Sequence, residues 1–197
     1  MAVAKTGSEI DAASDKALSA RGAQTFTVPA GAEVWSDAVT MAVSPNERFA
    51  VSVFVKTETA ARTWHQFGAQ TNYVGEGNML AAAKIEPPAG ASAPNTIQAY
   101  HWVTGVDVYR RPRTNVAVVI GDSNMDGFGS TLDANHRFTN CLARRVAADM
   151  PGIGVVSAGL AGNRLMLDGP VGEACRSVSR ATCCAKAASA KSSCKSE

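Results

Sequence analysis

A serine follows an apolar run in the second half of the chain. Residues 116–120 read VAVVI, and Gly121, Asp122 and Ser123 come directly after them. A serine hydroxyl is a weak nucleophile until it is exposed, oriented and deprotonated by a base. At the carboxyl end of a parallel strand it lies in the crevice where α/β sheets bind ligands, and Gly121 permits the tight exit from the strand. This pattern predicts acyl transfer through Ser123.

Two blocks of this sequence resemble those of a known enzyme family. Residues 116–130 (VAVVIGDSNMDGFGS) are similar to the first block of SGNH (GDSL-type) hydrolases, and residues 155–165 (VVSAGLAGNRL) are similar to the second. Residues 64–73 and 103–108 resemble the β-sandwich that precedes the catalytic domain in one bacterial subgroup of that family. The resemblance spans about residues 24–173 and implies a serine esterase.

The resemblance also assigns roles to residues near the predicted nucleophile. In the family arrangement, backbone N–H groups near Ser123 and the N–H group of Gly162 form the oxyanion hole. Each such donor contributes about 3–4 kcal/mol to transition-state stabilisation. Gly162 has no side chain, so a tetrahedral oxyanion can approach its N–H group. The residues in supporting positions are Gly121, Asp122 and Asn163.

The chain departs from the family pattern in three places. Ser157 stands where the second block usually has Asn. The third block, Gly-x-Asn-Asp, which supplies an oxyanion-hole asparagine, is absent. The Asp-x-x-His block that supplies the general base and the carboxylate that orients it is also absent. The resemblance therefore supplies a nucleophile and part of an oxyanion hole, as in a C-terminally truncated or frameshifted member of the family.

The histidines are the candidates for a replacement base. His136 follows Asp133 in an Asp-x-x-His spacing and lies thirteen residues after Ser123. This match lies before the predicted helix rather than at the missing block, so we interpret the Asp-x-x-His spacing as a coincidence. His136 is still a candidate for a surrogate base, because of its position close to Ser123. The alternative is an exposed histidine in the first turn of a helix. His65 and His101 flank tryptophans, and we interpret both as packing residues.

The same loop also matches a calcium-binding pattern. Asp122, Asn124 and Asp126 occupy positions 1, 3 and 5 of an EF-hand loop, with Gly127 at position 6 and Asp133 at position 12. An EF-hand loop follows a helix, whereas this one follows a β-type run, and position 12 is normally Glu. A Ca²⁺ ion here would act as a Lewis acid without a histidine. A calcium-dependent lactonase is therefore an alternative to a serine esterase that needs no cofactor.

The first half of the chain has the pattern of short β-strands. Aromatic and β-branched residues alternate with polar ones between turns that contain Gly or Pro, which is typical of an antiparallel sandwich. The runs that predict strands are 49–55, 63–67, 98–103 and 106–109.

The second half has the pattern of a parallel α/β unit. Residues 116–120 and 154–158 are continuous apolar runs, which predict strands buried on both faces. Residues 135–149 predict a helix, because apolar side chains recur at i, i+4 and i+8. The fold class we predict is α+β, in which an antiparallel β-sandwich is followed by an incomplete, flavodoxin-like parallel α/β unit.

Composition shifts divide the chain into four predicted parts. Residues 1–20 are small and polar and are expected to be loose or weakly helical. Residues 21–112 form the predicted sandwich, and residues 113–173 form the partial SGNH-type unit. Residues 174–197 are basic and rich in Ala, Ser, Lys and Cys, a composition that cannot bury enough apolar area to offset its ordering entropy.

Charge and hydropathy limit the classes of partner. The chain has 197 residues and a net charge of +2, without the basic stripe of a nucleic-acid binder. No apolar run reaches the roughly 20 residues of a membrane span, and the N-terminus lacks the apolar core of a signal peptide, so we expect a soluble protein of open localisation. The expected substrate is a small ester or lactone.

An incomplete sheet also predicts self-association, because a two-stranded parallel sheet leaves edges and an apolar face unpaired. The main rival to an enzyme is a truncated, non-catalytic product whose sandwich binds carbohydrate or protein.

Overall fold

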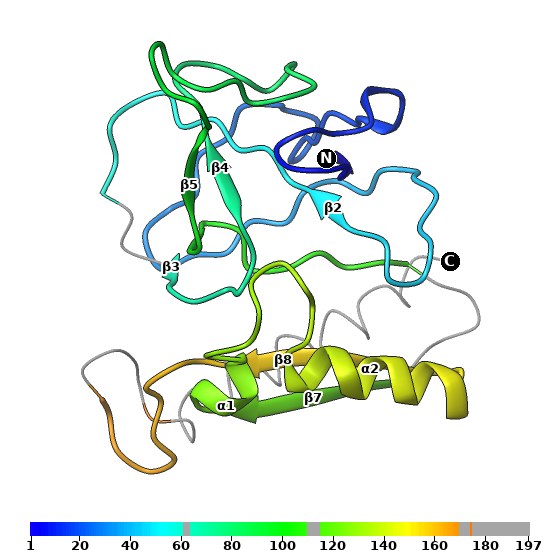
Figure 1. The fold of residues 1–197 in the computed structure, drawn as a ribbon. Helices are drawn as coiled ribbons and strands as arrows, with labels where there is room; N and C mark the ends of the chain where they lie inside the picture. Colours follow the sequence, from blue (N-terminus) through cyan, green and yellow to red (C-terminus); the bar gives the residue numbers. More distant parts are fainter. Residues whose placement is uncertain (61–63, 110–114, 170–173, 175–197) are drawn as a thin grey trace. The chain divides into compact units, whose positions relative to one another are not determined.

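The chain divides into two units, each built from segments that are separated in the sequence (Figure 1). The computed structural model of the protein describes residues 1–60, 64–109, 115–169 and 174. Unit 1 comprises Met1–Ala60 and Tyr73–Ile97, and unit 2 comprises Ala61–Asn72 and Gln98–Glu197. Strands, small antiparallel sheets, a parallel pair and helices are all present, so the predicted mixture of α and β structure is confirmed.

Unit 1 begins with an ordered segment rather than a loose one. β1 (Ala2–Val3) pairs antiparallel with β2 (Phe49–Ala50), and the side chain of Ala2 is only 1% exposed. The 3₁₀ helix η1 (Ala12–Ser14) is capped by Asp11, whose carboxylate accepts a hydrogen bond from a backbone N–H group of the helix. Pairing with a distant strand therefore orders residues that are weakly structured by composition alone.

The β-strands of the first half are shorter than the sequence predicts. β4 (Asn72–Val74) pairs with β5 (Asn95–Ile97), and in unit 2 β3 (Trp64–His65) pairs antiparallel with β6 (Tyr100–His101). Each sheet in the described part of the chain has two strands. Only the first two residues of the predicted strand 49–55 are strand, and its last three side chains are exposed. Alternation of apolar and polar side chains therefore indicates an extended chain here more reliably than it indicates a strand that is hydrogen-bonded to a neighbour.

The predicted strand–loop–helix–strand order of the second half is confirmed. β7 (Asn115–Gly121) and β8 (Ile153–Gly159) are parallel, in a register that places Gly121 opposite Gly159. In the sequence, α1 (Ser123–Asp126) and α2 (Phe138–Asp149) come between these two strands, and both helices contact the strand pair (Figure 1). The helix thus begins three residues later than the predicted range of 135–149. Among the described residues, no helix is long and apolar enough to cross a membrane.

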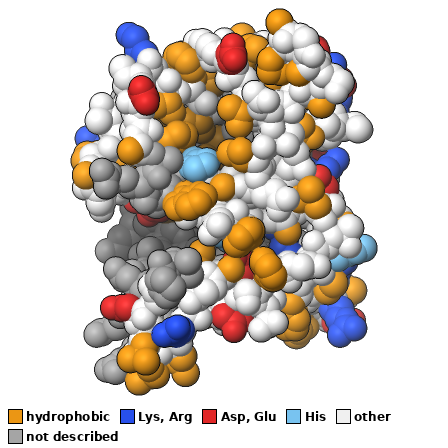
Figure 2. Space-filling model, turned by 60° about the vertical axis from the view of Figure 1, so that its left-hand side comes forward, with side chains coloured by type: hydrophobic (Ala, Val, Ile, Leu, Met, Phe, Trp, Pro, Cys, Tyr) orange, Lys and Arg blue, Asp and Glu red, His pale blue; other side chains and the backbone are white. Residues whose placement is uncertain are grey.

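The strands of this pair are less buried than their apolar sequences predict. The first three residues of β7 are exposed and the other four are half-buried, so burial on both faces is wrong for this strand. Val116 of β7 is 47% exposed, and Phe138 of α2 is 50% exposed. Large hydrophobic side chains are exposed at many points of the surface (Figure 2). The physical reason is that the described residues give each strand one neighbour, whereas an interior strand has two.

Glycines allow α1 to lie directly on the ends of the two strands. A Cβ atom at Gly159 would overlap the backbone at Asp126 and Met125, and a Cβ atom at Gly121 would overlap the Met125 side chain. α1 ends at Gly127, whose φ of 90° is in the left-handed region that favours glycine. The backbone of α1 therefore packs directly against the ends of the two strands, with no side chain between them.

Replacement of Gly159 tests this close approach. We expect Gly159→Ala to lower the free energy of unfolding by about 1–3 kcal/mol, because the new methyl group forces the backbone of α1 away from β8. Gly152→Ala is the matched control, since a Cβ atom there meets nothing within 4 Å. Urea unfolding monitored by circular dichroism measures both variants. Equal stability of the two would contradict the packing described.

A carboxylate in unit 1 holds a turn together. Asp37 accepts hydrogen bonds from the Ser19 hydroxyl at 2.7 Å and from the backbone N–H groups of Gly22 at 2.8 Å and Arg21 at 3.0 Å. These donors, the Ser19 hydroxyl first, lower the pKa of Asp37 below the ordinary value of an aspartate. The ionised carboxylate therefore stabilises the folded state.

The stability of unit 1 should depend on pH through this group. A lowered folded-state pKa contributes stability that is present above the unfolded pKa and is lost as the pH falls through the folded pKa. We expect Asp37→Asn to unfold at lower urea concentration than the wild type at pH 7, with a smaller difference below about pH 4. The exposed Glu58→Gln is the control. A difference that stays constant down to pH 2.5 would show that the charge of Asp37 is not responsible.

Candidate functional site

Ser123 is the first residue of α1 and follows the carboxyl end of β7. Asp122 is the N-cap of α1, and its Oδ1 atom accepts hydrogen bonds from the backbone N–H group of Asn124 at 3.0 Å and from the Asn124 side chain at 3.1 Å. The Ser123 carbonyl accepts hydrogen bonds from the N–H groups of Gly127 and Phe128, which close the turn. The sequence-predicted nucleophile is thus half-buried, on a turn fixed at both ends.

The predicted oxyanion glycine lies in the loop after β8. The N–H group of Leu160 donates to the Gly121 carbonyl at 3.1 Å, which continues the pairing of the strands into the loop. The N–H group of Asn163 then donates to the Leu160 carbonyl at 3.1 Å, and the turn passes through Gly162 at a φ of 85°. Ser123 and Gly162 therefore belong to neighbouring loops at the same carboxyl edge of the parallel pair.

Asn163 has an unsatisfied acceptor beside this turn. Asn163 has 9% of its surface exposed, and its Oδ1 atom has no hydrogen-bond partner among the described residues. A buried acceptor without a donor costs about 1–3 kcal/mol.

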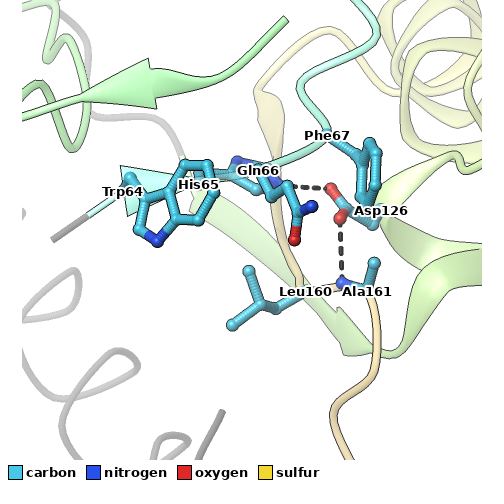
Figure 3. Close-up of a pocket in the computed structure, with 7 residues that line it drawn as sticks. All are labelled: Trp64, His65, Gln66, Phe67, Asp126, Leu160 and Ala161. Atoms are coloured by element: carbon cyan, nitrogen blue, oxygen red, sulfur yellow. Dashed lines mark hydrogen bonds and ion pairs between the residues drawn. The ribbon is translucent and has the colours of Figure 1, made fainter. Parts of the chain in front are cut away.

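A histidine–carboxylate pair, which the sequence did not reveal, lies at the other end of α1. Asp126 is buried, and its Oδ1 atom lies 2.6 Å from Nε2 of His65 on β3 (Figure 3). Its Oδ2 atom accepts a hydrogen bond from the N–H group of Ala161 at 2.9 Å. Sequence reasoning assigned His65 to packing and Asp126 to a cation loop. The Ser-x-x-Asp spacing could have linked Asp126 to the predicted nucleophile, because it puts Ser123 and Asp126 on one face of a helical turn.

This pair lines a small cavity within unit 2. The cavity has a volume of about 220 Å³, and Figure 3 shows its lining side chains around the His65–Asp126 contact. Ser123 and Gly162 are outside the lining set. The lining residues are Trp64, His65, Gln66, Phe67, Asp126, Leu160 and Ala161. The lining therefore mixes apolar side chains with an imidazole, an amide and a carboxylate.

The Asp133–His136 match does not form a pair. The Oδ1 atom of Asp133 accepts a hydrogen bond from the Thr71 N–H group at 2.7 Å, and its Oδ2 atom accepts one from the Thr71 hydroxyl at 2.6 Å. His136 is exposed, and within the described residues no hydrogen bond joins it to Asp133. Asp133 therefore ties two loops together, in a left-handed conformation with a φ of 61°.

The carboxylates of the predicted calcium loop point to separate partners. Asp122 caps α1, Asp126 binds His65 and Ala161, and Asp133 binds a threonine. The segment after Asp122 is a helical turn rather than an open loop. Across the described ranges, no group of three or more His, Cys, Asp or Glu side chains is arranged to hold a metal ion.

No protein-family model matches this chain, and no curated protein matches it. A functional proposal therefore depends on the geometry of the two loops and of the His65–Asp126 pair, together with the sequence resemblance.

Proposed function

We propose that the protein is a serine hydrolase that acts on carboxylic esters through Ser123. The parallel register of β7 and β8 supports this proposal, because it brings the turn with Ser123 and the turn with Gly162 to one edge. Ligands of open α/β sheets bind at that edge. The resemblance to SGNH hydrolases implies a nucleophile and an oxyanion donor at the same two positions.

The proposed chemistry is acyl transfer in two steps. The Ser123 Oγ atom attacks the ester carbonyl carbon, and the alcohol leaves as an acyl-enzyme forms. Water then attacks the acyl carbon and releases the acid. The N–H group of Gly162 donates to the carbonyl oxygen while it carries negative charge. Gly162 is exposed and has no side chain, so this oxygen can approach closely.

The proposed substrates are short acyl esters or small lactones. In the described part of the chain the sheet that carries Ser123 has two strands, which cannot wall a deep pocket for a long acyl chain. The calcium-dependent lactonase is not carried forward, because the carboxylates it needs bind separate protein groups.

The proposal extends to the finer architecture. We propose that β7, α2 and β8 are the opening of a flavodoxin-like parallel sheet, as the apolar strands and the helix between them suggest. We also propose that β3 and β6, which pair antiparallel, belong to the β-sandwich predicted over residues 21–112.

Covalent labelling tests the role of Ser123. We expect a fluorophosphonate probe to label the full chain at Ser123, and Ser123→Ala to abolish labelling and lower hydrolysis of p-nitrophenyl acetate at least ~10³-fold. Ser130→Ala, in the same loop, is the control and should behave as the wild type. Peptide mass spectrometry locates the label. A wild-type chain that does not react would remove the serine-hydrolase proposal in favour of the non-catalytic binding module.

The exposed apolar surface predicts self-association. Val116 on β7 and several other large hydrophobic residues remain exposed, and such surfaces pair readily with other chains. We expect size-exclusion chromatography with light scattering to give a mass above 20.4 kDa at micromolar concentration. A monomeric mass at every concentration would contradict the view that the parallel sheet is incomplete.

A further inference from the structure

The Asp126 carboxylate is buried and bound at both oxygens. Its side chain is 3% exposed, with Oδ1 against Nε2 of His65 at 2.6 Å and Oδ2 accepting from the N–H group of Ala161 at 2.9 Å. Burial of a carboxylate is costly unless donors surround it. The two donors come from β3 and from the loop after β8, so Asp126 fixes both relative to α1 within unit 2.

His65 is held by this carboxylate and still reaches solvent. Its side chain is 36% exposed and lines the cavity, and Figure 3 shows it directed toward Asp126. In a serine triad, a carboxylate binds one imidazole nitrogen and the other nitrogen takes the serine proton. Here Asp126 binds Nε2, so Nδ1 is the nitrogen left to accept a proton. A fixed imidazole beside a cavity has the arrangement expected of a general base.

Ser123 lies one helical turn from this pair. Ser123 and Asp126 are the first and last residues of α1. Residues three apart on a helix are neighbours on one face, with Cβ atoms about 5–6 Å apart. Asp126, with the imidazole bound to it, therefore lies one helical turn from Ser123, although Ser123 is not among the residues that line the cavity.

The other two histidines are poorer candidates for this role. His136 is exposed, and the carboxylate predicted to orient it binds Thr71 instead. His101 is stacked on Trp64 with ring centroids 5.9 Å apart, and its buried Nδ1 atom has no hydrogen-bond partner in the part of the chain that the structure describes.

We propose that His65 is the general base for Ser123 and that Asp126 is its positioning residue; this inference rests on the proposed function. The imidazole takes the Ser123 proton as the bond from Oγ to the acyl carbon forms, and it returns that proton to the leaving alcohol. It then takes a proton from water as water attacks the acyl carbon. Finally, it reprotonates Ser123 as the acyl–oxygen bond breaks, which leaves a carboxylic acid.

The other titratable groups around His65 come from two elements. Asp126 approaches from α1, and Tyr100 and His101 come from β6, the partner strand of β3. The Tyr100 ring lies 6.1 Å from the His65 ring, and burial raises the pKa of Tyr100. A raised pKa keeps this phenol neutral near pH 7. Arg137 is hydrogen-bonded to Tyr100 and is the neighbouring permanent cation.

The rate of fluorophosphonate labelling, measured against pH on the full chain, tests this proposal. We expect His65→Gln to slow labelling and p-nitrophenyl acetate hydrolysis ~10²–10⁴-fold at pH 7.5. The wild-type rate should fall toward acid pH as an imidazole gains its proton, and His65→Gln should lose that dependence. His136→Gln is the matched control and should retain both the rate and the pH profile. Circular dichroism confirms that each variant is folded.

Asp126→Asn provides a second test that keeps His65. An amide can donate to the imidazole as well as accept from it, so the ring is no longer held in the tautomer that leaves Nδ1 free to accept a proton, and the labelling rate at pH 7.5 should fall at least ~10-fold. Asp126→Glu keeps a carboxylate and should retain more of the rate than Asp126→Asn. Folded Asp126→Asn that is labelled at the wild-type rate would overturn the proposal.

The outcomes separate this inference from the proposed function. If Ser123 is labelled in the wild type and His65→Gln reacts at the same rate with the same pH profile, His65 is not the base, although the serine hydrolase remains. If the wild type is not labelled at all, both proposals fall.

Discussion

The arrangement of unit 2 at the carboxyl edge of its strand pair depends on the buried carboxylate of Asp126. It joins β3, α1 and the loop after β8 through one histidine and one backbone N–H group. A carboxylate with 3% exposure cannot lose either donor without a large desolvation cost. The same two hydrogen bonds therefore hold the loops together and orient the imidazole, so stability and proposed chemistry share one side chain.

The strand pair supplies the frame for that contact. Its parallel register brings the residues after β7 and β8 to one edge, and the glycines at both strand ends let α1 approach at backbone distance. Ser123 and Gly162 take their places from this frame, and Asp126 takes its place from the length of α1. A single helical turn thus carries the proposed nucleophile at one end and the residue that positions its base at the other.

The sequence predicted features that depend on local pattern and missed those that depend on distant neighbours. Apolar runs located β7 and β8, and i, i+4 spacing located α2, because each signal lies within one element. Burial of β7 was overestimated, since it depends on which strands lie beside it. The contact between His65 and Asp126 joins residues 61 apart, and no periodicity marks such a pair. Only two residues of the predicted strand 49–55 are strand, because strand pairing also depends on residues that are distant in the sequence.

The separation of His65, Asp126 and Ala161 in the sequence has a consequence for synthesis of the protein. His65 is made long before Asp126, and Ala161 follows 35 residues later. While a ribosome is extending the chain between Asp126 and Ala161, the carboxylate has at most one of its two donors. Both must be present before its burial is favourable. The nascent chain therefore cannot complete this contact until the second strand of the pair has emerged.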